Sequence, residues 1–380
     1  MITQKANEIT PFIVMEVLEK AAEMERRGIN VIHLEVGEPD FDVPPCVSEA
    51  VGKAFNEGRT HYTHSLGDPE LREEIAKRYL SMYGVKISPE QIIVTSGSSP
   101  AILLTLGVLC DVDDDVIISD PGYACYANFI RFLNAKAVKV PVFEEDGFQY
   151  RPSEIEKRIT NRTKAIMINS PMNPTGNLLS PEVMKELLKF GIPIISDEIY
   201  HGLVYEGRAH SILEFTENAF VLNGFSKLFA MTGLRLGYVI APKQCVRPMQ
   251  KLQQNLFICA GSTEQRAGIA ALQSAGNEVA IMRETYNQRR KYIIERLIQL
   301  GFDIKVPPTG AFYVFVNVKH ISVDSYKLAF DILEKAHVGV TPGIDFGENG
   351  EGFLRFSYAN SIENIKEGMN RLEKYLAALK

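Results

Sequence analysis

Residues 165–200 read AIMINSPMNPTGNLLSPEVMKELLKFGIPIISDEIY, and their pattern decides the fold class. Two short apolar runs, 165–169 and 193–196, flank a segment at 181–189 whose apolar residues recur with helical spacing. Short strands separated by helices favour a parallel or mixed sheet that is covered by helices on both faces. We therefore predict an α/β fold.

The same alternation continues on both sides of this unit. Further short strands are predicted at 92–95, 116–119, 220–223 and 237–240, with a helix at 100–109. The outer parts of the chain differ in style, and they predict a smaller α+β module with which the N-terminal helix packs. Its predicted elements are a helix from Phe12 that ends at Gly28, a strand at 31–36, a long charged helix at 282–300, strands at 311–318 and 353–358, and a final helix.

Composition places the chain among ordinary globular proteins. Of its 380 residues 46% are hydrophobic and 23% are charged, and the net charge is −6. This composition excludes disorder or a coiled coil as the overall class, and the mild acidity gives no reason to expect nucleic acid or a membrane as partner. The first ten residues lack the apolar core of a signal peptide, and the five cysteines are scattered without CxxC spacing. These features favour the cytoplasm and give no metal site.

Polar residues follow the predicted strands where those strands end. Ligands of open α/β sheets bind beyond the carboxyl ends of the strands, so these residues are the candidates for a site. We expect them to converge at one edge of the sheet. They are Ser98, Ser99, Tyr123, Asn173, Asp197, Tyr200, Ser226, Lys227 and, eight positions after the lysine, Arg235.

Three of these groups suit a phosphate and an aldehyde. A Gly/Ser turn that opens a helix at Ser98 and Ser99 offers N–H groups and hydroxyls to an anion. Arg235 adds a cation that can bind a phosphate with two hydrogen bonds. Lys227 is a candidate nucleophile for a Schiff base.

The remaining groups suit an aromatic ring that carries polar atoms. Asp197 can hold the proton of a pyridinium nitrogen, and Tyr123 can stack on a ring face. Asn173 and Tyr200 can donate to a phenolate oxygen. Phosphate, aldehyde, ring nitrogen, phenolate and ring face are the parts of pyridoxal phosphate (PLP).

Seven motifs, in order and nearly from end to end, carry a resemblance to a known family. They are GEPDF at 37–41, HYT at 61–63, SPMNPTG at 170–176, SDEIY at 196–200, GFSK at 224–227, MTGLRLGY at 231–238 and LRFSYA at 354–359. The sequence resembles the PLP-dependent class I/II aminotransferases of fold type I, in their short bacterial and archaeal aspartate-type branch. The resemblance implies a large PLP-binding domain (residues 46–275) with a mostly parallel seven-stranded sheet between helices. It also implies a small α+β domain formed by residues 1–45 and 276–380.

The resemblance also implies the roles of single residues. Lys227 carries the cofactor and later moves a proton between the substrate Cα and the cofactor, while Asp197 keeps the pyridine nitrogen protonated. The implied cofactor contacts are the O3′ donors Asn173 and Tyr200, the stacking ring of Tyr123, and the phosphate ligands Ser98, Ser99, Ser226 and Arg235. The implied substrate contacts are Arg355 on the α-carboxylate, with Gly37 and Asn173 beside it.

The resemblance implies a homodimer with a shared active site, in which Tyr62 reaches the phosphate of the neighbouring subunit. The sequence also departs from its relatives. Gly224 stands where some carry a serine, the segment 252–262 has no arginine for a second carboxylate, and the apolar segment 100–107 has no lysine.

These features lead to a predicted reaction and its alternatives. The resemblance favours a ping-pong aminotransferase that uses an L-amino acid of the aspartate type and a 2-oxo acid, 2-oxoglutarate by expectation. The alternatives are a donor that is alanine, aromatic or otherwise neutral, a C–S lyase of the same fold and, from a different class, a non-catalytic PLP-binding regulator. A regulator would be expected to lack Lys227 or Asp197, and both are present.

Overall fold

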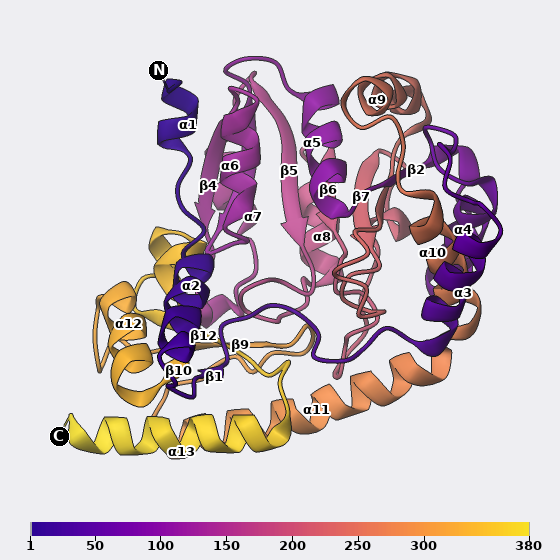
Figure 1. The fold of residues 1–380 in the computed structure, drawn as a ribbon. Coiled ribbons are helices and arrows are strands. Elements are labelled where there is room, and N and C mark those ends of the chain that lie inside the picture. Colours follow the sequence, from indigo (N-terminus) through magenta and orange to yellow (C-terminus); the bar gives the residue numbers. More distant parts are fainter. Residues whose placement is uncertain (1, 380) are drawn as a thin grey trace.

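A seven-stranded sheet forms the centre of the computed structural model, which describes residues 2–379 (Figure 1). All neighbouring strands are parallel except that β8 runs antiparallel to β2 and to β7. The α/β class predicted from the sequence is therefore confirmed. In spatial order the strands are β2 (Ile92–Thr95), β8 (Gly237–Ile240), β7 (Ala219–Gly224), β6 (Ile194–Asp197), β5 (Thr163–Asn169), β3 (Asp115–Asp120) and β4 (Lys136–Pro141).

Side chains of these strands alternate between two cores because successive residues of a strand point to opposite faces. In β5, Ala165 and Met167 belong to the core under helices α5 (Ser98–Leu109), α6 (Cys125–Phe132) and α9 (Lys243–Leu256). Ile166 and Ile168 belong to the core on the other face, which includes α4 (Pro69–Tyr83), α8 (Pro181–Leu188) and α10 (Ser262–Ser274). Both faces are thus buried, which explains why the strands read as continuous apolar runs.

A second, smaller sheet lies below the first in Figure 1. It is antiparallel, with the order β11 (Thr341–Pro342), β12 (Phe353–Ser357) and β9 (Tyr313–Asn317). The predicted strand at 31–36 is shorter than expected. Only β1 (Ile32–His33) pairs, because its parallel partner β10 (Val338–Gly339) is itself two residues long.

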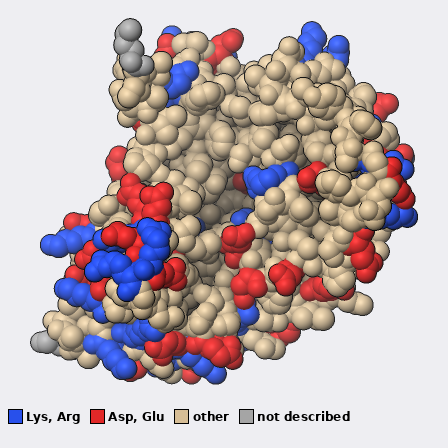
Figure 2. Space-filling view, viewed as in Figure 1, with Lys and Arg blue, Asp and Glu red and all other residues tan. Residues whose placement is uncertain are grey.

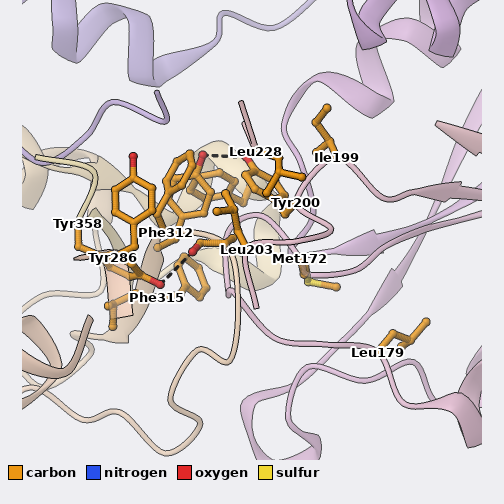
Figure 3. Close-up of a cluster of buried hydrophobic side chains, with 14 of the residues drawn as sticks. Met172, Leu179, Ile199, Tyr200, Leu203, Leu228, Tyr286, Phe312, Phe315 and Tyr358 are labelled. Carbon is orange, nitrogen blue, oxygen red and sulfur yellow. Dashed lines mark hydrogen bonds between the residues drawn. The ribbon is translucent and has the colours of Figure 1, made fainter. Parts of the chain in front are cut away.

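The two sheets share one apolar core. Tyr200 and Leu203, which follow β6, belong to this core. So do three aromatic residues of the smaller part of the molecule: Phe312 beside β9, Tyr286 of α11 and Tyr358 beyond β12 (Figure 3). This cluster fixes the strand ends of the large sheet against the small one. The helices around the small sheet are α11 (Gly276–Gln299), α12 (Ser325–Ala336) and α13 (Ile362–Ala378). The remaining α-helices of residues 2–379 are α1 (Gln4–Glu8), α2 (Ile13–Arg26), α3 (Pro45–Asn56) and α7 (Pro152–Glu156).

Helix α2 packs on the small sheet's side of the molecule, as the sequence suggested. Its Val17, Ala21 and Met24 are buried with Leu333 of α12. Among residues 2–379, none of the helices is both long enough and apolar enough to span a bilayer. Figure 2 shows acidic and basic side chains interspersed over the surface, and this face is hollowed at its centre.

Candidate active site

A cavity of about 380 Å³ lies at the carboxyl ends of β5, β6 and β7, beside the start of α5 and next to β12. All but one of the predicted site residues line it. They are Gly37, Ser98, Ser99, Tyr123, Asn173, Asp197, Tyr200, Ser226, Lys227, Arg235 and Arg355. The exception is Tyr62, which is 80% exposed and lies outside this cavity. Its predicted role concerns a neighbouring subunit, and it stays a prediction.

Lys227 follows β7 and projects its amine into the cavity. Nζ donates a hydrogen bond of 2.6 Å to the carbonyl oxygen of Gly37. Burial lowers the pKa of Lys227 to about 8; the charge of Glu38 opposes this shift, and Arg355 and Arg235 add to it. A lysine with such a pKa is partly neutral near pH 8, and a neutral amine is what nucleophilic attack on a carbonyl requires.

Asp197 ends β6 and is buried. The hydroxyl of Tyr126 donates to its Oδ2 at 2.6 Å, and the backbone N–H of Ile199 donates to its Oδ1 at 3.1 Å. Burial raises the pKa of Asp197 to about 6, while these two hydrogen bonds and Lys227 oppose the shift. Asp197 is therefore mainly ionised above pH 7, and its carboxylate is held in one orientation.

An anion site is formed where α5 begins. Gly97 has a φ of +92°, and Ser98 and Ser99 form the first turn of the helix, two residues earlier than the predicted start at 100. A Cβ on Gly237 would lie 2.6 Å from the carbonyl carbon of Gly97 and 2.8 Å from the nitrogen of Ser98, so only glycine fits there. Backbone N–H groups at a helix start favour an anion.

Arg235 lies against this turn. A Cβ on Gly97 would be 2.6 Å from Arg235 Nη2, so the guanidinium lies directly over the glycine. Its Nη1 donates to the carbonyl oxygen of Thr232 at 3.1 Å. The guanidinium and the helix start therefore face the same volume, which suits a phosphate.

Arg355 of β12 reaches the cavity from the small sheet. It is 2% exposed, and its Nη1 donates to Asn173 Oδ1 at 2.9 Å. Nη2 donates to the carbonyl oxygen of Glu35 at 2.6 Å and to Thr341 Oγ1 at 3.1 Å. Its Nε is buried and has no hydrogen-bond partner in the described part of the chain. Arg355 thus keeps donor capacity that points to a carboxylate ligand.

Comparison with known proteins shows the family to which this chain belongs. Residues 29–372 match the family described as aminotransferase class I and II. The chain belongs to this family. It is a transaminase of the PLP-dependent fold type I.

Two relatives and one solved structure illustrate how closely this aminotransferase follows its family. It is 43% identical to a (5-formylfuran-3-yl)methyl phosphate transaminase of Methanocaldococcus jannaschii, over 99% of this chain and 100% of the relative. It is 42% identical to an aspartate aminotransferase of Pyrococcus horikoshii, over 96% of this chain and 94% of the relative. The structure of an aspartate aminotransferase from Thermus thermophilus with maleate gives a TM-score of 0.94 at 35% identity, and it covers 98% of this chain and 99% of that chain.

Two tyrosines of the aminotransferase site were missed by sequence reasoning. Tyr126 holds Asp197, as described above, and Tyr313 shares a hydrogen bond of 2.8 Å with the hydroxyl of Tyr200. A Cβ on Gly37 would clash with the hydroxyl of Tyr313, so glycine is required at that position. Neither Tyr126 nor Tyr313 belongs to a motif that would have marked it in the sequence.

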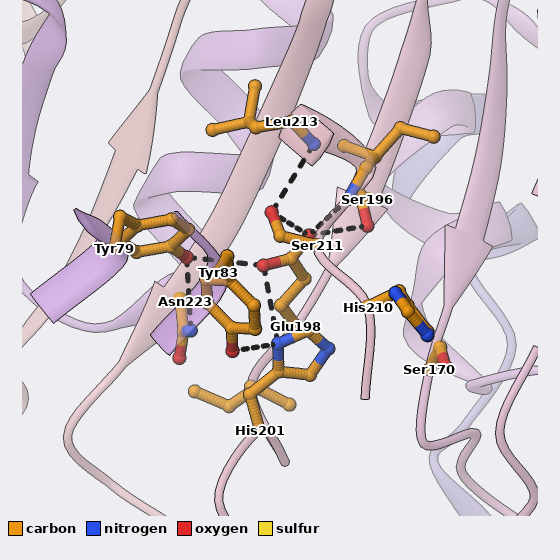
Figure 4. Close-up of polar contacts among 12 residues, drawn as sticks. Tyr79, Tyr83, Ser170, Ser196, Glu198, His201, His210, Ser211, Leu213 and Asn223 are labelled. Carbon is orange, nitrogen blue, oxygen red and sulfur yellow. Dashed lines mark hydrogen bonds and ion pairs between the residues drawn. The ribbon is translucent and has the colours of Figure 1, made fainter. Parts of the chain in front are cut away.

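Glu198, the residue after Asp197 in the sequence, forms a buried polar cluster (Figure 4). Its Oε1 accepts hydrogen bonds from Ser196, Ser211 and the backbone of Ile212, and its Oε2 accepts from Tyr79 at 3.2 Å. Burial raises the pKa of Glu198 to about 8. The cluster ties the end of β6 to α4, which supports the position of the neighbouring aspartate.

The N-terminal helix contributes a further part of the site that the sequence did not indicate. Phe12, Val14, Met15 and Leu18 line the cavity. No charged or polar motif marks these residues, so nothing in the sequence distinguishes them from ordinary packing residues.

Proposed function

We propose that this transaminase binds PLP in the cavity and exchanges an amino group between an L-amino acid and a 2-oxo acid in a ping-pong sequence. The observation that carries the proposal is that Lys227, Asp197 and Arg355 converge in one cavity of about 380 Å³. An amine of lowered pKa, a buried carboxylate and a guanidinium are the three groups that this chemistry needs on different sides of one substrate.

The shape of the cavity supports PLP as the cofactor. The turn at Gly97, where a Cβ on either Gly97 or Gly237 would collide, leaves space beside the N–H groups of α5 for a phosphate. Arg235 lies over the same turn, and Ser226 lines the same cavity. Asp197 also lines this cavity, and its carboxylate would meet the pyridine nitrogen of the cofactor.

PLP, when bound, supplies an aldehyde carbon for an amine and a ring that accepts electron density from the substrate Cα. Lys227 Nζ would hold that carbon and, as a free amine, would remove the proton from the substrate Cα. Asp197 would hold the proton on the ring nitrogen, because its buried negative charge would stabilise a cationic ring.

The other residues orient the reacting groups. Asn173 and Tyr200 would donate to the ring oxygen O3′, and Tyr123 would stack against the ring face. Arg355 binds the α-carboxylate through its paired N–H groups, and its contact with Asn173 aligns the substrate with the cofactor. The backbone of Gly37 lies beside the same carboxylate.

The proposal extends to the assembly and the domains. We propose that residues 46–275 form a large domain and that residues 1–45 and 276–380 form a small domain. We also propose a homodimer in which Tyr62 reaches the phosphate site of the neighbouring subunit. The exposed position of Tyr62, at 80%, leaves its hydroxyl accessible to a second copy. Sedimentation of the holoenzyme tests the dimer, and a monomer with full activity would contradict it.

Products distinguish the transaminase from its alternatives. Incubation of the holoenzyme with an amino acid and no acceptor should yield the matching 2-oxo acid and pyridoxamine phosphate in equal amounts. A C–S lyase would release a thiol or sulfide and return the cofactor unchanged, and a binding protein would give no product. Aspartate and 2-oxoglutarate, the pair that the sequence favours, are the first substrates to assay. The name of the relative from Pyrococcus horikoshii, an aspartate aminotransferase, supports the choice of aspartate.

A further inference from the structure

Tyr313 of β9 lines the cavity beside the groups that the proposed function uses. Its place follows from the pairing of β9 with β12, in which Tyr313 lies opposite Ser357, two positions from Arg355. Residues two positions apart in a strand point to the same face of a sheet. Tyr313 and Arg355 are therefore diagonal neighbours on one face, close enough for an aromatic ring to reach a guanidinium.

The ring of Tyr313 lies against the guanidinium of Arg355. Arg355 Cζ is 4.3 Å from the ring centroid, which is the distance of a cation–π contact. Both side chains are buried, so bulk water competes little with this contact. The ring therefore favours one orientation of the group that, under the proposed function, binds the substrate α-carboxylate.

The hydroxyl of Tyr313 meets the residue that would bind the cofactor oxygen O3′. Its oxygen is 2.8 Å from the hydroxyl oxygen of Tyr200, and the two rings meet edge-on with 5.7 Å between their centroids. The same hydroxyl packs against Gly37, where a Cβ would collide with it. The position of the Tyr313 hydroxyl is thus fixed by a hydrogen bond and by a close backbone.

The direction of the hydrogen bond between the two tyrosines follows from their protons. Each phenol has one proton to donate, and burial raises the pKa of both tyrosines, so both keep that proton at neutral pH. If Tyr200 donates its proton to O3′, the proton between the two tyrosines must come from Tyr313. A hydroxyl that accepts a hydrogen bond is also a stronger donor to the next acceptor.

We propose, on the basis of the transaminase function above, that Tyr313 is a positioning residue that links the substrate carboxylate site to the cofactor. Its hydroxyl donates to Tyr200 and thereby directs the proton of Tyr200 to O3′, while its ring holds Arg355 in place. Tyr313 acts through these two neighbours and exchanges no proton with the substrate.

The role of the hydroxyl is tested by following the visible absorbance of the PLP-loaded enzyme as a function of pH. This absorbance reports whether Lys227 Nζ, when joined to the cofactor, carries a proton. Negative charge on O3′ stabilises that proton, and a hydrogen bond donated to O3′ weakens this effect. Tyr313→Phe should therefore raise the pKa of this nitrogen by about 0.5 pH unit, and Tyr200→Phe should raise it further.

Tyr358→Phe is the matched control for this titration. Its hydroxyl is also buried in the same core, but it donates to the carbonyl oxygen of Ala311 at 3.2 Å, away from Tyr200. The control should keep the wild-type pKa. An unchanged pKa in Tyr313→Phe, or an equal shift in Tyr358→Phe, would overturn the inference and leave the transaminase function intact. A wild-type protein that binds no PLP would contradict the proposed function itself.

A second measurement separates the ring of Tyr313 from its hydroxyl. Tyr313→Phe keeps the ring over Arg355, so KM for the amino donor should change by less than about twofold, whereas Tyr313→Leu removes the ring and should raise KM by roughly 5- to 10-fold. Steady-state rates at a saturating concentration of acceptor give both values. An equal rise of KM in the two variants, or an unchanged KM in a folded, PLP-loaded Tyr313→Leu enzyme, would show that the ring does not hold Arg355 and would overturn the inference.

Discussion

The site has two sides that differ in chemistry and in how far the sequence reveals them. On the side of the large sheet, charged and polar groups lie at strand ends: Asp197 is the last residue of β6, and Lys227 follows β7. On the side of α2, the cavity is lined by apolar residues such as Phe12 and Met15. The difference teaches that motifs in the sequence mark the strand-end side of the cavity, while the residues of the α2 side line the same cavity without any motif.

The largest expected effect is on the strand-end side. Lys227→Ala should lower the transamination rate by at least about 10⁴-fold, since it removes both the attachment point of the cofactor and the proton carrier. Single-turnover rates with an amino acid measure this loss. Lys243→Ala, at an exposed position in the first turn of α9, serves as the control and should keep full activity. A Lys227→Ala enzyme that transaminates at the normal rate would refute the assignment.

Arg355 joins the two sides because it reaches the cavity from the small sheet. Arg355→Ala should raise KM by roughly 10- to 100-fold for every amino acid, since the loss of charge-assisted hydrogen bonds to the α-carboxylate is independent of the side chain. Arg355→Lys, which keeps the charge but loses the paired geometry, should fall between. Steady-state KM values for an apolar and an acidic donor check this, and an effect confined to one donor would contradict the role.

The sequence predicted the strand-end side well because its constraints are local. A residue that directly follows a parallel strand must lie at the same edge as its counterparts, so Asn173, Asp197 and Lys227 could be brought together without a structure. Tyr126 and Tyr313 could not be assigned, because their roles depend on which strand and helix pack beside them. The length of β1 also could not be predicted from the sequence, since it depends on pairing with the two-residue strand β10.

The cavity residues on the α2 side could not be predicted from the sequence for a different reason. Its residues are those of any amphipathic helix, and Val17 faces α12 while Met15, two positions earlier, faces the cavity. The face that meets the site depends on contacts with distant segments, such as the anchoring of the helix start by Asp345, which is more than 300 positions away in the sequence. Contacts between such distant segments leave no periodic pattern to read.

A smaller effect is therefore expected at the anchor of α2. Burial raises the pKa of Asp345 to about 6, so it is mainly ionised at pH 7.5 and binds two backbone N–H groups as a carboxylate. Asp345→Ala should lower the free energy of unfolding by about 1 kcal/mol, the usual effect of losing the acceptor for the first N–H groups of a helix, while PLP binding stays unchanged. Urea unfolding and the cofactor spectrum measure the two quantities separately. A variant that loses PLP but keeps its stability would contradict the separation of the two sides.

The smallest expected effect concerns the contact between His33 and Glu25, which lies near the end of α2, and the pH dependence of this contact. His33 donates to Glu35 at 2.6 Å and pairs with Glu25, and the hydrogen bond to Glu35 raises the pKa of His33 to about 9 in spite of partial burial. A raised pKa in the folded state means a contribution to stability that is complete below pH 6.5 and is lost as the pH rises through about 9. Urea unfolding at pH 6 and pH 10 should show a larger loss of stability in the wild type than in His33→Gln. Equal losses would refute the His33 contribution.

Reduction of the PLP-loaded protein with borohydride tests the central claim most directly. The reagent fixes the cofactor covalently to the amine that holds it, and peptide mass spectrometry then locates that amine. The account predicts a single modified residue, Lys227, and no modification when an amino acid has first converted the cofactor to pyridoxamine phosphate. Attachment at a different lysine, or no attachment in a protein that transaminates, would contradict the account.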